Sequence, residues 1–177
     1  MNPKILLFLL CIATIAATSQ ETLSFKGSKP YRATNSWSFI CEKYALTGAA
    51  SIQIAKTEKG GILKLAVETT NPAFNIAGTS YIYLADNFII TCSDKGIREN
   101  KENQIVSYYS LSPLEMNKIK NIDIQSIRFN IKGNSGKYSS QTGNFTAVNQ
   151  KTYFSTATDE AKKKHTTALE IKALYQY

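Results

Sequence analysis

The chain has 177 residues, 21 basic and 13 acidic side chains, one His and three Cys, and a formal net charge of +8. This length fits one domain with a substantial core. One His and a few scattered Cys are too few for a zinc site of three or four close ligands. Neither G-x-x-x-x-G-K-[ST] nor G-x-G-x-x-G occurs, so nucleotide binding has no support and no cofactor is predicted.

Residues 1–19 are typical of a cleavable secretory signal. Lys4 precedes an apolar run from Ile5 to Ala17, and small residues lead to a cleavage site before Gln20. Thirteen apolar residues are too few to cross a hydrocarbon layer about 30 Å thick. We therefore expect a periplasmic or secreted protein whose mature chain, residues 20–177, is a single domain without a transmembrane segment. Loss of Lys4 leaves it a net charge of +7.

The first half of the mature chain is predicted to form strands. Residues 20–36 form a polar arm with one short strand, and residues 37–41 begin the core as a strand or as the first turns of a helix. Period-two alternation predicts two hairpins, over residues 51–68 and 79–92. Their turns are expected over Lys56–Gly61, where the Gly pair can take positive φ, and at Asp86-Asn87. The charged residues 93–103 are predicted to be an exposed loop, followed by a strand over 104–110.

The second half contains the predicted helices. Ser112, Pro113 and Glu115 form a capping-box pattern that starts a short helix. Strands follow over 124–131 and 144–148, separated by a Gly/Ser-rich loop, and an apolar stripe over 155–175 predicts one long helix. The sequence thus predicts an α+β domain, with an antiparallel sheet of five to seven strands and the C-terminal helix packed on it.

Cys41 and Cys92 remain after removal of the signal, and two interpretations are open. An even pair in an oxidising compartment favours a disulfide. Alternatively, both are buried thiols that pack as small hydrophobic side chains.

No catalytic group stands out. His165, the one His, lies in a Lys-rich stretch that disfavours its protonated form, so a general-base role is not expected. A calcium site among the acidic residues of 93–103 is opposed by the interleaved Lys95, Arg98 and Lys101. No pair of carboxylates is distinguished by the sequence.

Two groups of residues are candidates for ligand contact. Tyr81 and Tyr83 share one strand face, and Tyr109 is one of two adjacent tyrosines on the next strand. If these rings are exposed, they can stack on sugars or bases. If they are buried, they pack in the core. The tight run Lys162, Lys163 and Lys164 is a candidate contact for anions.

The stretch from Tyr81 to Ile131 resembles a pattern in small exported proteins of Bacteroidetes-type bacteria. In that pattern a strand ends at an L-x-D-G-like turn, two strands follow, and a capped S-x-x-E-x-x-x-L helix leads to I-x-x-I-R. This chain has Asp86-Asn87 at the turn, and Ile119 or Ile122 at the Leu position. The resemblance implies an envelope setting and brings no activity or functional residue.

Together these observations favour a non-enzymatic binding or interaction module. The partner would be another envelope protein or a polysaccharide; nucleic acid is not expected. Two alternatives remain: a hydrolase with carboxylates brought together by the fold, and a binder of anionic polymers that uses a basic surface such as Lys162–Lys164.

Overall fold

The computed structural model describes residues 21–42, 48–101, 103–133, 141–152 and 163–176. The predicted signal, residues 1–19, lies outside these ranges. Strands make up 53% of the structure and helices 11%. The predicted α+β class is therefore wrong, and the domain is mostly β.

The elements follow one another along the chain with two helices late in the order. The strands are β1 (Glu21–Leu23), β2 (Tyr31–Ala33), β3 (Trp37–Cys41), β4 (Ala49–Thr57), β5 (Gly60–Glu68), β6 (Asn75–Ile76), β7 (Ser80–Leu84), β8 (Ile89–Arg98), β9 (Gln104–Leu111), β10 (Ile124–Lys132) and β11 (Gly143–Val148). The helices are α2 (Pro113–Ile119) and α4 (Thr167–Ala173).

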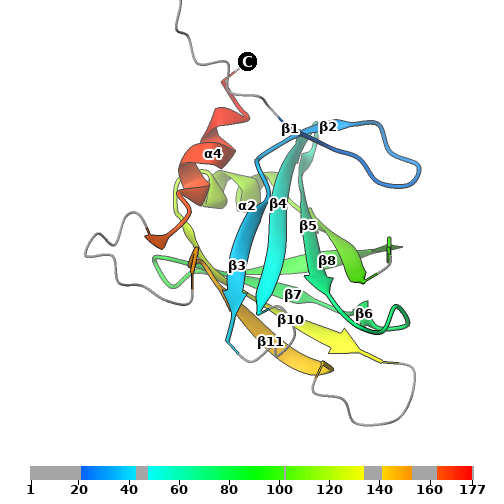
Figure 1. The fold of residues 1–177 in the computed structure, drawn as a ribbon. Coiled ribbons are helices and arrows are strands. Elements are labelled where there is room, and N and C mark those ends of the chain that lie inside the picture. Colours follow the sequence, from blue (N-terminus) through cyan, green and yellow to red (C-terminus); the bar gives the residue numbers. More distant parts are fainter. Residues whose placement is uncertain (1–20, 43–47, 102, 134–140, 153–162, 177) are drawn as a thin grey trace, which may run out of the picture.

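Eight of the strands close into an antiparallel barrel (Figure 1). Their order around it is β3-β4-β5-β9-β8-β7-β10-β11, and β11 pairs with β3 to close the ring. The predicted hairpins are confirmed as β4–β5 and β7–β8. The sheet is antiparallel as predicted, but the expected five to seven strands are too few, because pairing between β5 and β9 and between β7 and β10 joins the hairpins into a closed ring of eight.

The barrel interior is filled with apolar side chains. Inward residues such as Ile52, Leu63 and Ile82 have no exposed surface. An eight-stranded barrel is just wide enough for side chains to fill it. The interior is therefore a packed core, and ligand contact falls to the outer surface.

Helix α2 closes one end of the barrel, near α4 (Figure 1). The predicted capping box is present: Ser112 Oγ accepts from Glu115 N, and Glu115 Oε2 accepts from Ser112 N. Met116 and Ile119 of α2 are fully buried. Gly61 allows this approach, because a Cβ there would collide with the Met116 side chain.

Residues 21–36 of the predicted arm cover part of the barrel's outside. Strands β1 and β2 form a hairpin, drawn in blue in Figure 1, and Ala33 of β2 pairs with Ala55 of β4. A second apolar cluster lies between this hairpin and the barrel, made by Leu23, Ala33, Ala55, Ile62, Ala66, Val106 and Tyr108.

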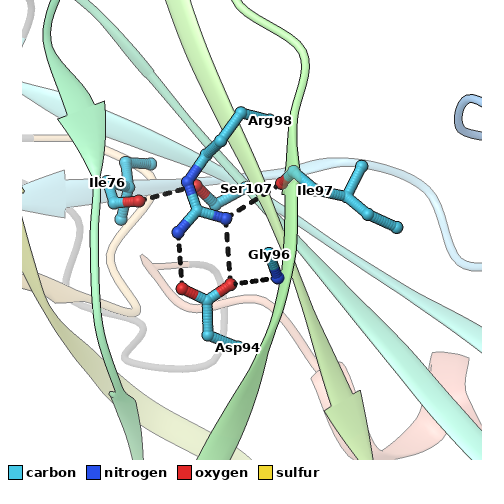
Figure 2. Close-up of polar contacts among 6 residues, drawn as sticks. All are labelled: Ile76, Asp94, Gly96, Ile97, Arg98 and Ser107. Carbon is cyan, nitrogen blue, oxygen red and sulfur yellow. Dashed lines mark hydrogen bonds and ion pairs between the residues drawn. The ribbon is translucent and has the colours of Figure 1, made fainter.

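The predicted loop over residues 93–103 is wrong, because β8 continues to Arg98. Figure 2 shows the reason: Asp94 Oδ1 accepts from Gly96 N and Arg98 Nη1 at 2.8 and 2.9 Å, and Asp94 Oδ2 accepts from Arg98 Nη2 at 2.5 Å. Four steps along β8 from Asp94 to Arg98 match two along β9, which makes this a bulge. The bulge brings the two charges together, so a polar sequence can remain in the sheet.

The long helix predicted over residues 155–175 is also wrong. Residues 153–162 lie outside the described ranges, and α4 has only seven residues. The Asn149 side chain accepts from His165 N at 2.8 Å and donates to His165 O at 2.9 Å. These two bonds hold the His165 backbone in place just before α4 begins.

Cys41 and Cys92 do not form the predicted disulfide. They lie on β3 and β8, which are four strands apart in either direction around the barrel. Strands that face each other across a packed interior are about 10 Å apart, beyond the Cα separation of a disulfide. Burial raises the pKa of each thiol to about 12, so the interpretation as buried thiols is the correct one.

Candidate ligand-binding face

The outer surface of β7, β8, β10 and β11 carries the best candidate for a binding site. On β7 the side chains alternate, so that Ile82 and Leu84 fill the barrel while Tyr81 and Tyr83 point outward. The β1–β2 hairpin pairs with β4, on the other part of the barrel, and so does not cover this surface. Tyr81 is 38% exposed and Ile89 is 49% exposed.

Strand register brings the residues of this surface together. Tyr81 is opposite Thr91 on β8 and opposite Arg128 on β10. Tyr83 is opposite Ile89. Directly opposed side chains in an antiparallel pair have Cβ atoms about 5 Å apart and interact. A shallow hollow of about 460 Å³ results, which we call the tyrosine face, lined by Tyr81, Tyr83, Ile89, Thr91, Arg128 and Asn144.

The polar groups of the tyrosine face are mostly available for an external ligand. In the part of the chain that the structure describes, Tyr81, Tyr83 and the Arg128 guanidinium make no hydrogen bond or ion pair. Asn144 Oδ1 accepts from Asn130 Nδ2 at 3.1 Å, which orients its amide. The hollow therefore combines two aromatic rings with an unengaged cation and an oriented amide.

Tyr109, the third predicted stacking residue, lies elsewhere. It points into the barrel with no exposed surface, and burial raises the pKa of its hydroxyl. It packs in the core and cannot contact a ligand, so this part of the prediction is corrected. Of the two adjacent rings on β9, Tyr108 faces outward, and the arm covers it.

The predicted basic run is only partly described. Lys162 lies outside the described residues, while Lys163 and Lys164 precede α4. Lys164 and His165 line a hollow of about 510 Å³ with Asp123, Asn149 and other residues at the ends of β10 and β11. The His165 ring stacks on Phe39, and burial lowers its pKa. Anion contact by Lys162, Lys163 and Lys164 therefore stays a prediction.

Paired carboxylates are missing from five surface hollows that described residues line. Each hollow is lined by Glu58, by Asp123 or by no carboxylate. Asp123 Oδ1 already accepts from Thr167 Oγ1 and Ala168 N. A glycosidase needs two carboxyl groups about 5–10 Å apart across the substrate, and none of these hollows supplies them.

The described residues contain neither a metal-binding cluster nor a membrane-spanning helix. No group of three His, Cys, Asp or Glu side chains is placed to hold a metal ion. Neither helix is long and apolar enough to cross a membrane.

Comparison with known proteins gave no match to a family model, a curated protein or a solved structure. The candidate site therefore depends on the geometry of this chain alone.

Sequence reasoning missed four of the six residues of the tyrosine face. The burial pattern of β10 puts Arg128 on the face opposite Ile127 and Phe129. The pairing of β7 with β10, which sets Arg128 beside Tyr81, joins strands with two others and a helix between them in the chain. No local turn signal could have indicated it.

Proposed function

We propose that this protein is an exported, non-enzymatic binding module that holds a neutral carbohydrate on its tyrosine face. The observation that carries the proposal is the pair Tyr81 and Tyr83 on an uncovered sheet surface beside Arg128, whose guanidinium has no partner among the described residues. A contiguous surface patch of aromatic and apolar side chains is a recurring feature of binding sites.

The chemistry of the hollow matches a sugar ring. Tyrosine rings pack against the C–H face of a pyranose, and their hydroxyls hydrogen-bond at its edge. Arg128, Asn144 and Thr91 add donors and acceptors for sugar hydroxyls. Arg128 is the one basic residue lining the hollow. A polyanion such as nucleic acid would call for several cations, so a neutral glycan fits better.

A hydrolytic role has less support. The barrel interior is packed, and the five described hollows contain no carboxylate pair. Binding without catalysis requires neither a deep cleft nor groups with strongly shifted pKa values at the site.

Export follows from the predicted signal. The expected product begins at Gln20, and mass spectrometry of protein recovered from periplasm or medium would test this. Intact protein with Met1, found in the cytoplasm, would contradict it.

Binding can be tested by affinity gel electrophoresis against neutral soluble polysaccharides: β-glucan, xylan, mannan and starch. We expect at least one to retard the protein, and Tyr81→Ala to weaken that interaction at least tenfold. Tyr175→Ala is the matched control, because Tyr175 is also 38% exposed but lies outside the tyrosine face. Equal retardation of Tyr81→Ala and the unmodified protein, or no retardation by any polysaccharide, would refute the proposal.

A further inference from the structure

Three hollows surround the turn between β4 and β5, away from the tyrosine face. All three are lined by Thr57 and Glu58, so they are contiguous. Their volumes are about 370, 200 and 250 Å³. We call this region the basic rim; its basic lining residues are Lys29, Arg32, Lys56, Lys59, Lys95 and Lys120.

The charge of the basic rim is strongly unbalanced. Among the described residues that line it, Glu58 is the one carboxylate, against six basic side chains. Glu58 Oε1 is within 2.5 Å of Lys29 Nζ, which neutralises that pair. Four lysines of the lining, Lys56, Lys59, Lys95 and Lys120, lie around this single turn in addition to that pair. Clustered like charges repel each other, and a bound anion would relieve that repulsion.

Aromatic rings hold several of these ammonium groups in place. Lys56 Nζ and Lys120 Nζ lie 4.7 and 4.9 Å from the centroid of the Tyr175 ring. At the other end of the rim, Lys95 Nζ lies 5.8 Å from the centroid of Phe25. Cation–π contacts fix the positions of long, flexible side chains. The rim therefore presents partly preorganised cations.

The rings themselves are not free to stack on bases. Phe25 is stacked with Tyr31 at a centroid separation of 6.3 Å and tilted against Tyr108 at 5.0 Å. The Tyr175 ring is in cation–π contact with Lys56 and Lys120. Proteins that bind single-stranded nucleic acid need open aromatic faces for successive bases. Phe25 and Tyr175 do not offer such open faces, so the cations are the groups of the basic rim that a ligand would contact.

We propose that the basic rim is a second binding site, for an acidic polysaccharide with carboxylate or sulfate groups. Three adjacent hollows suit a polymer better than a single small anion, because they spread the cations along one end of the barrel. The predicted export places the protein where such polymers occur. The site is separate from the tyrosine face and would act whether or not that face binds a neutral glycan.

The test measures binding of fluorescently labelled heparin and polygalacturonate as a function of salt concentration. Two charge-neutralised variants, Lys59→Gln/Lys95→Gln and Lys56→Gln/Lys120→Gln, are compared with the control Lys101→Gln/Lys132→Gln. The control removes the same net charge from exposed residues that line none of the three hollows.

We expect each rim variant to bind at least tenfold more weakly near 0.1 M salt. The slope of log affinity against log salt should fall by about two, one for each lost contact. The control and Tyr81→Ala should stay within twofold of the unmodified protein. Circular dichroism would verify that each variant is folded.

Three outcomes would overturn the proposal. One is no binding of either polymer. Another is an equal loss of affinity in the control pair, which would show an effect of net charge alone. The third is tighter binding of single-stranded DNA, or of vesicles with anionic lipids, than of either polysaccharide.

Discussion

The outside of the barrel has two surfaces that carry tyrosine side chains, and these side chains are buried on one surface and exposed on the other. On the β4–β5–β9 side, Tyr108 is covered by the N-terminal hairpin, is 1% exposed, and donates from its hydroxyl to Glu99 Oε2 at 2.6 Å. On the β7–β8–β10–β11 side, Tyr81 is 38% exposed and has no partner among the described residues. The tyrosine hydroxyl of the first surface thus has a partner within the protein, whereas that of Tyr81 is available to an external ligand.

This difference separates structural aromatic residues from candidates for function. The covered surface also orients the backbone of its arm, because Glu99 Oε1 accepts from Lys26 N at 2.6 Å. The Tyr108 hydroxyl and the Lys26 amide are both satisfied by the Glu99 carboxylate, as buried polar groups generally are. On the tyrosine face the same residue type stands in water beside an unengaged Arg128. Truncating a tyrosine should therefore cost stability on one surface and binding on the other.

The largest expected effect is on the covered surface. Tyr108→Ala removes a buried ring and leaves Glu99 without its hydroxyl partner, so the free energy of unfolding should fall by about 3–5 kcal/mol. Urea denaturation measures this directly. Tyr108→Phe keeps the ring and should recover most of the loss. A change below about 1 kcal/mol in Tyr108→Ala would show that the arm contributes little to the fold.

The next largest expected effect is a loss of stability when the packing of the N-terminal arm is weakened. Leu23 is 2% exposed under the hairpin, and Leu23→Ala should lower the free energy of unfolding by about 2–4 kcal/mol. Leu114 on α2 is 79% exposed, so Leu114→Ala is the matched control and should change stability by less than about 0.5 kcal/mol. Equal effects for the two variants would contradict the covering role of β1 and β2.

A smaller effect should appear as a pH dependence. Burial alone would raise the pKa of Glu99, but hydrogen bonds from Tyr108 and Lys26 N outweigh it and hold that pKa below its usual range. A carboxylate with a lowered folded-state pKa contributes stability above its unfolded pKa of about 4.3 and loses it as pH falls through the folded value. Glu99→Gln should therefore show a flatter decline in stability below about pH 4.5 than the unmodified protein. An unchanged decline would place the acid sensitivity elsewhere, for example at Asp94.

An element could be predicted when the residues that define it are close together in the sequence, and not when it depends on residues far apart. Alternation and Gly60-Gly61 identified the β4–β5 hairpin, and the capping residues identified α2, because those signals lie within a few residues. Barrel closure was missed because it depends on pairings between distant strands. Residues 93–98 were mistaken for a loop because their charges are paired only when the bulge brings Asp94 to Arg98.

The same limit applies to the candidate site: residues of one strand could be grouped from the sequence, but residues from different strands could not. Alternation correctly grouped Tyr81 with Tyr83, since Ile82 and Leu84 occupy the other face of one strand. It could not decide between Tyr108 and Tyr109, because adjacent strand residues face opposite ways and the direction of the interior is set by the whole barrel. Arg128 joined the site only through the pairing of β7 with β10.

The most direct test of the central claim is a combined measurement on Tyr81→Ala/Tyr83→Ala. The account predicts that its urea midpoint stays close to that of the unmodified protein, with a change in unfolding free energy below about 1 kcal/mol, while the affinity for the retarding polysaccharide falls at least tenfold. A loss of stability as large as that of Tyr108→Ala, or unchanged binding, would show that the two tyrosine surfaces do not differ in the way described.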